Sequence, residues 1–307
     1  MSIVYTVGET VLDIIFKDKK LKDAVAGGSV LNASVSMSRA GLDVSLLSDT
    51  GSDRTAGIIR CFLRENGVGC DYISVQEGAN TPLALAFLDS NNDAAYEFRR
   101  DGSAGRPRFS MPPIKKNDIV LFGSYYSIAS RTRSAVGEIV RGAAGHGATV
   151  IYDINFRRPH AGELPGLLTF IRENTRLAHI VRCSCEDLMT LFNECSIDTL
   201  REFTGDSPVL VITDAGRPVM VDSPVFRASF PVRHVKTVST IGAGDSFNAG
   251  MIFQVARAGL RAADLRVLGE NEWKKITEVA TAFAAEVCGS YNNYISPEFA
   301  KRAEQIF

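Results

Sequence analysis

Short runs of β-branched and other apolar residues recur along this chain and alternate with amphipathic stretches. Continuous apolar runs are typical of strands buried on both faces of a parallel sheet that helices cover on each side. The runs are residues 3–7, 44–48, 119–123, 149–153, 180–183 and 209–213. The pattern therefore predicts an α/β fold with a mostly parallel central sheet. Ligands of such sheets bind at the carboxyl ends of the strands.

Two segments, near 11–25 and 83–100, break this pattern because apolar and polar residues partly alternate in them, as in a half-exposed sheet. The polar turn 90–93 within the second segment predicts a hairpin. We expect a small β-sheet lid beside the main sheet; the alternative is two further strands of the main sheet. No internal repeat or low-complexity linker interrupts the chain, so we expect a single domain over 1–307.

Composition narrows the function. The chain has 307 residues, of which 45% are hydrophobic and 22% charged, and its formal net charge is -1. Scattered lysines and arginines do not form the basic stripe of a nucleic-acid binder. No apolar stretch approaches bilayer length, and the N-terminus lacks the features of a signal peptide. We expect small-molecule ligands, no nucleic-acid or membrane partner, and a cytoplasmic location.

Cysteines and histidines give no clear site. Six cysteines without a C-x-x-C pair argue against a disulfide framework and a zinc site, and favour a reducing compartment. Cys183 and Cys185 are two residues apart across an expected strand end, which is poor geometry for a shared metal. The histidines are isolated in sequence and are expected to be structural or exposed. They are His146, His160, His179 and His234.

Residues 240–245 read T-I-G-A-G-D and place a carboxylate in the opening turn of an expected helix. Gly242 and Gly244 let backbone N–H groups converge on an anion, and the helix dipole favours negative charge there. An anion site gains nothing from Asp245 unless this carboxylate takes a proton from an attacking hydroxyl. The stretch therefore indicates phosphoryl transfer; the alternative is an ordinary acidic residue in a first helical turn.

A second glycine bend, A-G-G-S-V-L-N at 26–32, also opens an expected helix. Paired glycines allow a polyhydroxylated ligand to approach the backbone, and the Asn32 amide can both donate to and accept from hydroxyls. The alternative is a simple helix-starting turn. The chain contains neither the G-x-x-x-x-G-K-[ST] phosphate loop nor the G-x-G-x-x-G dinucleotide fingerprint, which argues against a dinucleotide-dependent oxidoreductase.

These two glycine stretches together resemble the two signatures of the ribokinase-like (PfkB) family of sugar kinases. The resemblance continues, in the family's order, through Gly8 and Glu9 with Asp13, 51–53 with Gly57, 98–104 and 153–157. It implies a three-layer α/β/α sandwich with a small β-sheet lid. The stretch 98–104 is most similar to the fructokinase-like branch.

The resemblance also implies roles for individual residues. Asp245 would be the catalytic base, and the backbone of Gly242, Ala243 and Gly244 would hold the transferring phosphoryl group. The substrate-binding set would be Asp13, Gly27, Gly28, Asn32, Arg100, Asp153, Asn155 and Arg157. Asp153, Asn155 and Arg157 alternate along a strand end, so we expect their side chains to point toward the site; a structural ion pair is the alternative. Of the adjacent Arg99 and Arg100, we expect only one to reach the substrate.

The cofactors implied are ATP and Mg²⁺, but the nucleotide side departs from the family pattern. The family's N-x-x-E element corresponds to S-C-E-D at 184–187, leaving Glu186 and Asp187 as metal candidates. The nucleotide loop corresponds to 213–218, with Pro218 removing a donor. The expected nucleotide contacts are Thr213, Gly216, Ala280, Ala284 and Asn292, with helix packing as the alternative for the last three. Ser239 replaces an aspartate associated with a monovalent cation, which argues against potassium activation.

The resemblance therefore implies an ATP-dependent kinase that phosphorylates a sugar hydroxyl, with fructose as the expected substrate. The alternatives within the family are a 2-keto-3-deoxygluconate kinase and a ribokinase. A catalytically weak sugar or nucleotide sensor on the same fold is an alternative of another class. The resemblance also implies a homodimer through the lid, because pairing covers an exposed strand edge.

Overall fold

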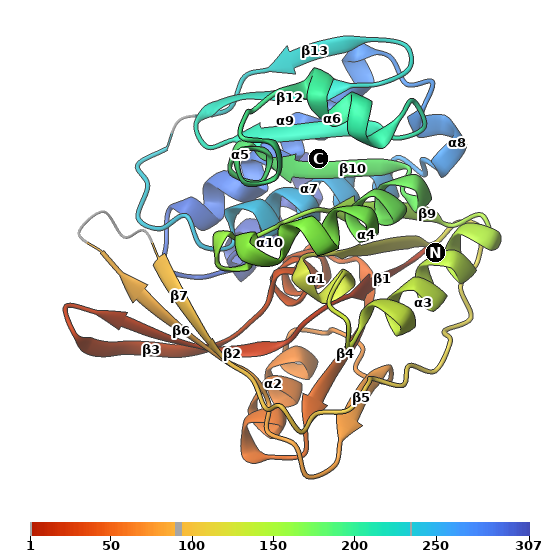
Figure 1. Cartoon of the computed structure of the whole chain (residues 1–307). Helices are drawn as coiled ribbons and strands as arrows, with labels where there is room; N and C mark the ends of the chain where they lie inside the picture. The colour runs from red at the N-terminus through yellow and green to blue at the C-terminus, as the bar shows by residue number, and fades with distance from the viewer. Residues whose placement is uncertain (1, 90–93, 234) are drawn as a thin grey trace.

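The computed structural model describes residues 2–89, 94–233 and 235–307 and consists of a large sheet, two helical layers and a small separate sheet (Figure 1). The large sheet has the order β13-β12-β11-β10-β9-β8-β1-β4-β5. Its strands are β1 (Ile3–Val7), β4 (Asp43–Gly51), β5 (Ile73–Gln76), β8 (Ile119–Gly123), β9 (Thr149–Asp153), β10 (Ile180–Ser184), β11 (Val209–Asp214), β12 (Arg217–Asp222) and β13 (Arg227–Phe230). Neighbouring strands from β11 to β5 are parallel, while β12 and β13 are antiparallel. Each predicted apolar run is one of the parallel strands, so the predicted fold class is confirmed.

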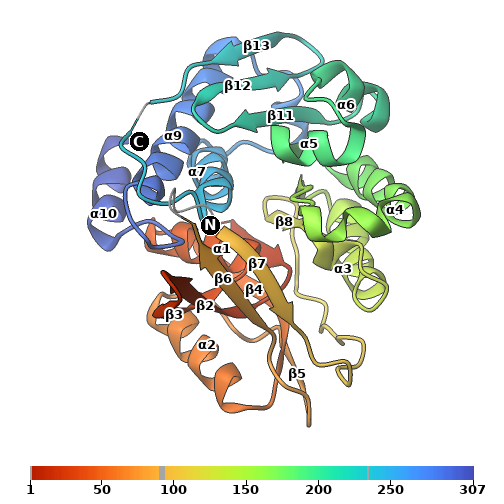
Figure 2. The same ribbon diagram turned by 60° about the vertical axis from the view of Figure 1, so that its left-hand side comes forward.

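Helices cover both faces of the large sheet, because alternate side chains of each buried strand point to opposite sides. Val4 packs into one hydrophobic cluster and its neighbour Tyr5 into the other. One layer holds α1 (Ser29–Arg39), α2 (Arg54–Glu65), α7 (Ala243–Arg257), α9 (Glu270–Cys288) and α10 (Pro297–Ile306), with the short α8 (Ala262–Leu265). The opposite layer holds α3 (Arg133–Gly145), α4 (Leu164–Leu177), α5 (Cys185–Phe192) and α6 (Ile197–Thr204). Figure 2 shows the two layers on opposite sides.

The small sheet has the order β3-β2-β6-β7 and projects from the main body, on the left of Figure 1. Its strands are β2 (Val11–Lys17), β3 (Lys20–Gly27), β6 (Leu83–Leu88) and β7 (Ala94–Arg99). The predicted lid segments therefore form a sheet of their own, and the alternative of two more strands in the main sheet is wrong. The predicted turn 90–93 lies outside the described residues.

The chain connections hold this lid over the carboxyl edge of the large sheet. β2 follows directly from β1, and β3 runs into α1. The inner face of the lid, with Ile15, Ala86 and Leu88, packs with Tyr96 and with Ile241 of the glycine loop before α7. Two short 3₁₀ helices, η1 (Tyr125–Ser127) and η2 (Arg158–Glu163), follow β8 and β9 at the same edge. Within the described ranges, no helix is long and apolar enough to span a bilayer.

Candidate active site

A cavity of about 810 Å³ lies between the lid and the carboxyl edge of the large sheet. Its walls come from the lid, from the loops after β1, β8, β9 and β10, and from the starts of α1 and α7. The strand-end loops contribute Glu9, Ser124, Tyr125, Asn155, Arg157 and Glu186. A ligand pocket is expected at this place in an α/β sheet, because loops from several strands converge there.

Asp245 lies in the first turn of α7 and lines this cavity. Its Oδ1 accepts a hydrogen bond from Ser29 Oγ at 2.7 Å, and its Oδ2 accepts one from Asn32 Nδ2 at 2.9 Å. Two donors on different oxygens fix the plane of the carboxylate. The two predicted glycine stretches therefore meet at Asp245, because the second of them carries both donors.

Gly242 caps the N-terminus of α7 in a left-handed conformation with φ 76°. A Cβ atom on this residue would lie 2.3 Å from the backbone oxygen of Asn293. Only glycine fits both conditions, since a side chain would be strained and would collide with main chain. The bend places Gly242 on the cavity wall at the N-terminus of α7, where the helix dipole favours an anion.

Asp13 on β2 is buried beside Asp245 and lines the same cavity. Asn293 Nδ2 donates to its Oδ2 at 3.1 Å. Burial and, next, the Asp245 charge raise the pKa of Asp13 to about 7. Gly27 makes room for this carboxyl group, because a Cβ there would lie 2.0 Å from Asp13 Oδ2. Gly28 lines the cavity, whereas Gly27 acts by leaving space.

Arg100, at the end of the lid, reaches the cavity while Arg99 does not. The Arg100 guanidinium bonds both carboxylate oxygens of Glu9, at 2.8 and 3.0 Å, and lies over the Phe98 ring. Arg99 pairs with Glu97 on the exposed surface. Of the two arginines, Arg100 is therefore the one that lines the cavity.

The expected alternation at 153–157 is only partly right, because β9 ends at Asp153 and Asn155 has φ 38°. Asn155 and Arg157 line the cavity, but Asp153 lies behind it. Its carboxylate pairs with Arg182 at 3.1 Å and accepts from Asn248 Nδ2 at 2.8 Å. Asp153 therefore forms a structural ion pair with Arg182, which is the alternative given above.

None of the predicted nucleotide contacts lines this cavity. Thr213 Oγ1 accepts from Arg182 at 2.6 Å, and Gly216 lies in the turn between β11 and β12. Ala280 on α9 is fully buried against Gly250 of α7, and Ala284 packs against the same core. Asn292 is exposed, but its neighbour Asn293 reaches the site. Asn293 bonds Asp13 of the expected substrate-binding set, so it does not take over the nucleotide role predicted for Asn292.

Glu186 and Asp187 lie in the first turn of α5, yet only Glu186 lines the cavity. Asp187 is buried and bonds protein groups with both oxygens. Its Oδ2 accepts from Ser184 in a capping box, and its Oδ1 accepts from the Phe156 backbone N–H at 2.7 Å. Asp187 therefore ties α5 to the loop after β9, and Glu186 is the carboxylate of the two that lines the cavity.

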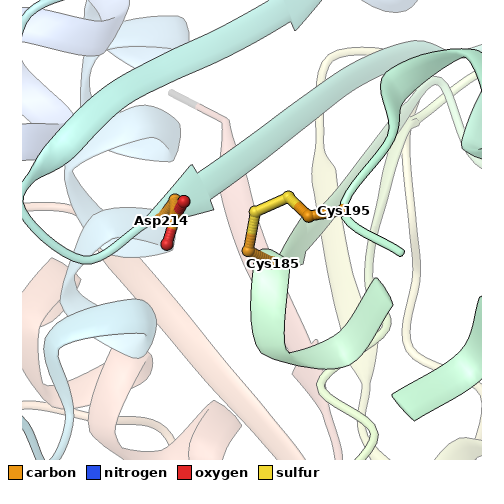
Figure 3. Close-up of side chains that lie close together, drawn as sticks. All are labelled: Cys185, Cys195 and Asp214. Atoms are coloured by element: carbon orange, nitrogen blue, oxygen red, sulfur yellow. A yellow bond between two sulfur atoms is a disulfide. The ribbon is translucent and has the colours of Figure 1, made fainter. Parts of the chain in front are cut away.

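Cys185 at the start of α5 forms a disulfide with Cys195, ten residues later, and Asp214 lies beside them (Figure 3). For this pair, the sequence argument against disulfides is wrong, because the helix and turn between residues 185 and 195 bring the two Cα atoms to 5.0 Å. The sequence reasoning also did not anticipate His160, which lines the cavity and stacks on Tyr125 with ring centroids 3.6 Å apart. His146 is exposed and His179 structural, accepting from the Val150 N–H; His234 lies outside the described residues.

Several site residues were missed by the sequence reasoning. They are Glu9, Ser29, Tyr96, Tyr125, Arg182 and Asn293. Ser29 lies inside a predicted glycine stretch, and Glu9 follows a predicted strand, so the surrounding sequence could have identified both as site residues. Arg182 and Asn293 carried no signal, since their roles depend on partners 29 and 280 residues away.

Comparison with known proteins agrees with this architecture. Residues 2–299 match the model of the pfkB family of carbohydrate kinases. Probable fructokinase-4 of Arabidopsis thaliana is 27% identical over 303 residues, covering 94% of this chain and 90% of the relative. Aminoimidazole riboside kinase of Salmonella typhimurium is 22% identical, over 84% of this chain and 82% of the relative.

Solved structures share the fold. Fructokinase from Vibrio cholerae, in a form with fructose, ADP and calcium ion bound, superimposes with a TM-score of 0.84 at 20% identity, covering 95% of this chain and 94% of that chain. The aminoimidazole riboside kinase of Salmonella enterica, complexed with aminoimidazole riboside and an ATP analogue, gives 0.83 at 20% identity, with 99% of each chain covered. The family match spans nearly the whole chain, and the protein belongs to the pfkB family of carbohydrate kinases.

Proposed function

We propose that the chain is an ATP-dependent fructokinase in which Asp245 is the general base. As a member of the pfkB family it is a phosphotransferase that acts on a sugar hydroxyl, using ATP with a divalent metal. The observation that carries the proposal is the placement of Asp245. Its carboxylate is held by Ser29 and Asn32 at the N-terminus of α7, on the wall of the cavity.

In the proposed reaction, the sugar hydroxyl gives its proton to Asp245 as its oxygen attacks the γ-phosphorus of ATP, and ADP leaves with the electrons of the broken P–O bond. The backbone N–H groups of Gly242, Ala243 and Gly244 would hold the transferring phosphoryl group. Arg157 supports the same role. Although burial acts to lower its pKa, the charges of Asp245 and Asp187 outweigh this and raise it, so the guanidinium stays cationic beside the phosphate.

Glu186 fits a divalent metal better than Asp187. Among the described residues, no protein donor bonds the Glu186 carboxylate on the cavity wall, whereas both Asp187 oxygens are already used. A single carboxylate is the kind of ligand that Mg²⁺ accepts, since this ion keeps several waters. Mg²⁺ held by Glu186 through water would neutralise phosphate oxygens.

We propose no potassium requirement, because Ser239 Oγ instead accepts from the Ile241 backbone N–H at 3.2 Å.

The charges near the lid favour a neutral sugar over a sugar acid. The Arg100 guanidinium is bonded to both oxygens of Glu9, so its charge is balanced before any ligand arrives. A sugar carboxylate would have to displace Glu9 and leave that carboxylate unpaired. Asp13 and Asn32 supply the acceptors and donors that sugar hydroxyls need. This supports fructose, or another neutral sugar such as ribose, over 2-keto-3-deoxygluconate.

The test is ADP release from Mg-ATP with fructose, ribose, aminoimidazole riboside, tagatose and 2-keto-3-deoxygluconate, each with and without potassium. We expect fructose to give the highest kcat/KM, with no potassium effect. A sugar acid as the best substrate would refute the charge argument. Sugar binding without turnover of any compound would favour a sensor.

Two further properties are proposed. Four cysteines are free thiols, namely the exposed Cys61 and also Cys70, Cys183 and Cys288, and free thiols fit a cytoplasmic location.

The lid exposes apolar side chains, with Leu21 64% and Phe87 40% accessible. A homodimer that covers these side chains would bury apolar surface and a strand edge. Light scattering of the native chain and of Phe87→Glu would test this arrangement.

A further inference from the structure

A disulfide joins Cys185 and Cys195 at the start of α5, and the first turn of this helix also carries Glu186 of the cavity wall. Cys185 is the first residue of α5, and Cys195 directly precedes Ser196, the N-cap of α6. Their Cα atoms are 5.0 Å apart, within the range that a disulfide spans. Figure 3 shows the bridge at the start of α5, beside the end of β11.

The setting of the pair differs from that of a purely structural bridge. Cys185 is buried and Cys195 is half-buried, so Cys195 is the more accessible residue of the pair. The other four cysteines of the chain are free, and one of them, Cys61, is exposed. Free, exposed thiols are typical of a reducing compartment, where a disulfide is usually transient. Asp214 adds a carboxylate within 4.8 Å of both sulfurs, although it also pairs with Arg217 at 3.0 Å.

The residues that follow Cys185 connect the bridge to the site. Glu186 lines the cavity, and Asp187 accepts a buried hydrogen bond from the Phe156 backbone N–H at 2.7 Å. Phe156 lies between Asn155 and Arg157, both of which line the same cavity. α5 also packs against η2, which follows this loop. The first turn of α5 thus supports the loop that carries two cavity side chains.

We propose that Cys185 and Cys195 are a reversible thiol–disulfide site whose oxidised state holds the first turn of α5, and with it Glu186 and the 155–157 loop, against the cavity. The reacting partners are small thiols and disulfides. The thiolate of a dithiol reductant attacks Sγ of Cys195, the bond to Cys185 breaks, and Cys185 leaves as a thiolate that takes up a proton. The second reductant thiol then displaces Cys195, which is also protonated. Two electrons and two protons pass to the chain, and the reductant becomes a cyclic disulfide.

The first experiment measures the site without using enzyme activity. The full chain is equilibrated in buffers of varied reduced and oxidised glutathione, quenched with acid and alkylated, and peptides with residues 185 and 195 are quantified by mass spectrometry. We expect both sulfurs to change together in one two-electron transition, while Cys61 is alkylated under reducing conditions regardless of the pair. Cys61→Ser is the matched control and should leave the transition unchanged. Independent alkylation of the two sulfurs, absence of the disulfide at every ratio, or reduction only after unfolding would overturn the proposal.

The second experiment tests the connection to the cavity. Amide exchange is followed for peptides covering 153–157 in the oxidised and reduced chain. We expect reduction to speed exchange of the Phe156 amide by about tenfold or more, since the bridge restrains local opening. Cys195→Ser should exchange at the reduced rate in either buffer, and Cys61→Ser should behave like the native chain. Equal exchange in both states would refute the coupling.

The kinetic consequence rests on the proposed fructokinase activity. Reduction should raise the KM for Mg-ATP several-fold, because Glu186 and Arg157 would be less well held. If exchange responds to reduction but fructose is not phosphorylated in either state, the thiol pair stands and the proposed substrate fails.

Zinc binding is a competing use of the Cys185 and Cys195 sulfurs and the Asp214 carboxylate. Uptake of one equivalent of Zn²⁺ by the reduced chain, lost in Cys195→Ser and blocking reoxidation, would overturn the redox site in favour of a metal site.

Discussion

Replacing Asp245 by asparagine should remove the catalytic base while the fold is kept. The carboxylate accepts one hydrogen bond from Ser29 and one from Asn32. In Asp245→Asn, one oxygen becomes an NH₂ group, which would face the Asn32 donor. Asn32 can turn its amide, because its own Oδ1 is buried without a partner and can accept from the new NH₂ group. Both hydrogen bonds are then kept in weaker, neutral form.

The expected magnitudes follow from this geometry. Exchanging two charge-assisted bonds for neutral ones costs about 1 to 2 kcal/mol of unfolding free energy. Removal of the Asp245 charge also relieves Asp13, whose raised pKa is due in part to that charge, and this opposes the loss. General base catalysis contributes about 10²- to 10⁴-fold in rate, which corresponds to about 3 to 5 kcal/mol of activation free energy. The effect on kcat should therefore exceed the effect on stability.

The assay combines steady-state ADP release at saturating fructose and Mg-ATP with thermal unfolding of each variant. We expect kcat of Asp245→Asn to fall at least a hundredfold, with little change in ATP affinity. Ser29→Ala is the control, since it removes one donor and leaves the carboxylate, and its kcat should fall about tenfold or less. A folded Asp245→Asn enzyme that keeps more than about a tenth of the native kcat would refute the assignment of the base.

Three other changes test the site. Arg100→Ala should raise the KM for sugar much more than the KM for ATP, whereas Arg99→Ala, on the outer surface, should leave both unchanged; equal increases for Arg100→Ala would refute its lid role. Asp13 has a folded pKa of about 7 against 3.8 for the free group, so its contribution to stability is fully present below 3.8 and is lost as pH rises to about 7. The loss is at most about 4 kcal/mol, and urea unfolding of Asp13→Asn should show a smaller decrease over that pH range than the native chain. Gly242→Ala should abolish activity and destabilise the fold, because φ is 76° and main chain blocks a Cβ, whereas Gly57→Ala in α2, with open space around it, should raise the melting temperature slightly; an active Gly242→Ala enzyme would contradict the proposed anion site.

Local pattern was sufficient for six strands of the large sheet and for the lid segments. The apolar runs 119–123 and 149–153 are β8 and β9 with the same boundaries, because a strand buried on both faces must be apolar throughout. The helix after Gly242 and the lid segments were predicted for similar reasons, since glycine bends and period-two alternation are local signals. The catalytic candidate Asp245 belongs to this group, because its glycine context lies next to it in sequence.

The tertiary structure decided which side chains share the cavity, because these contacts join residues far apart in the chain. Asp153 was expected to face the substrate, but β9 ends at that residue and Arg182 of the neighbouring strand holds its carboxylate. Asn293 reaches Asp13 across 280 positions, and Cys185 meets Cys195 only because α5 and the turn after it bring them together. The sequence by itself determined the order of strands and helices and the glycine bends, since these depend on neighbouring residues. Burial, the raised pKa of Asp13 and the partners of each buried charge arise only when those elements pack.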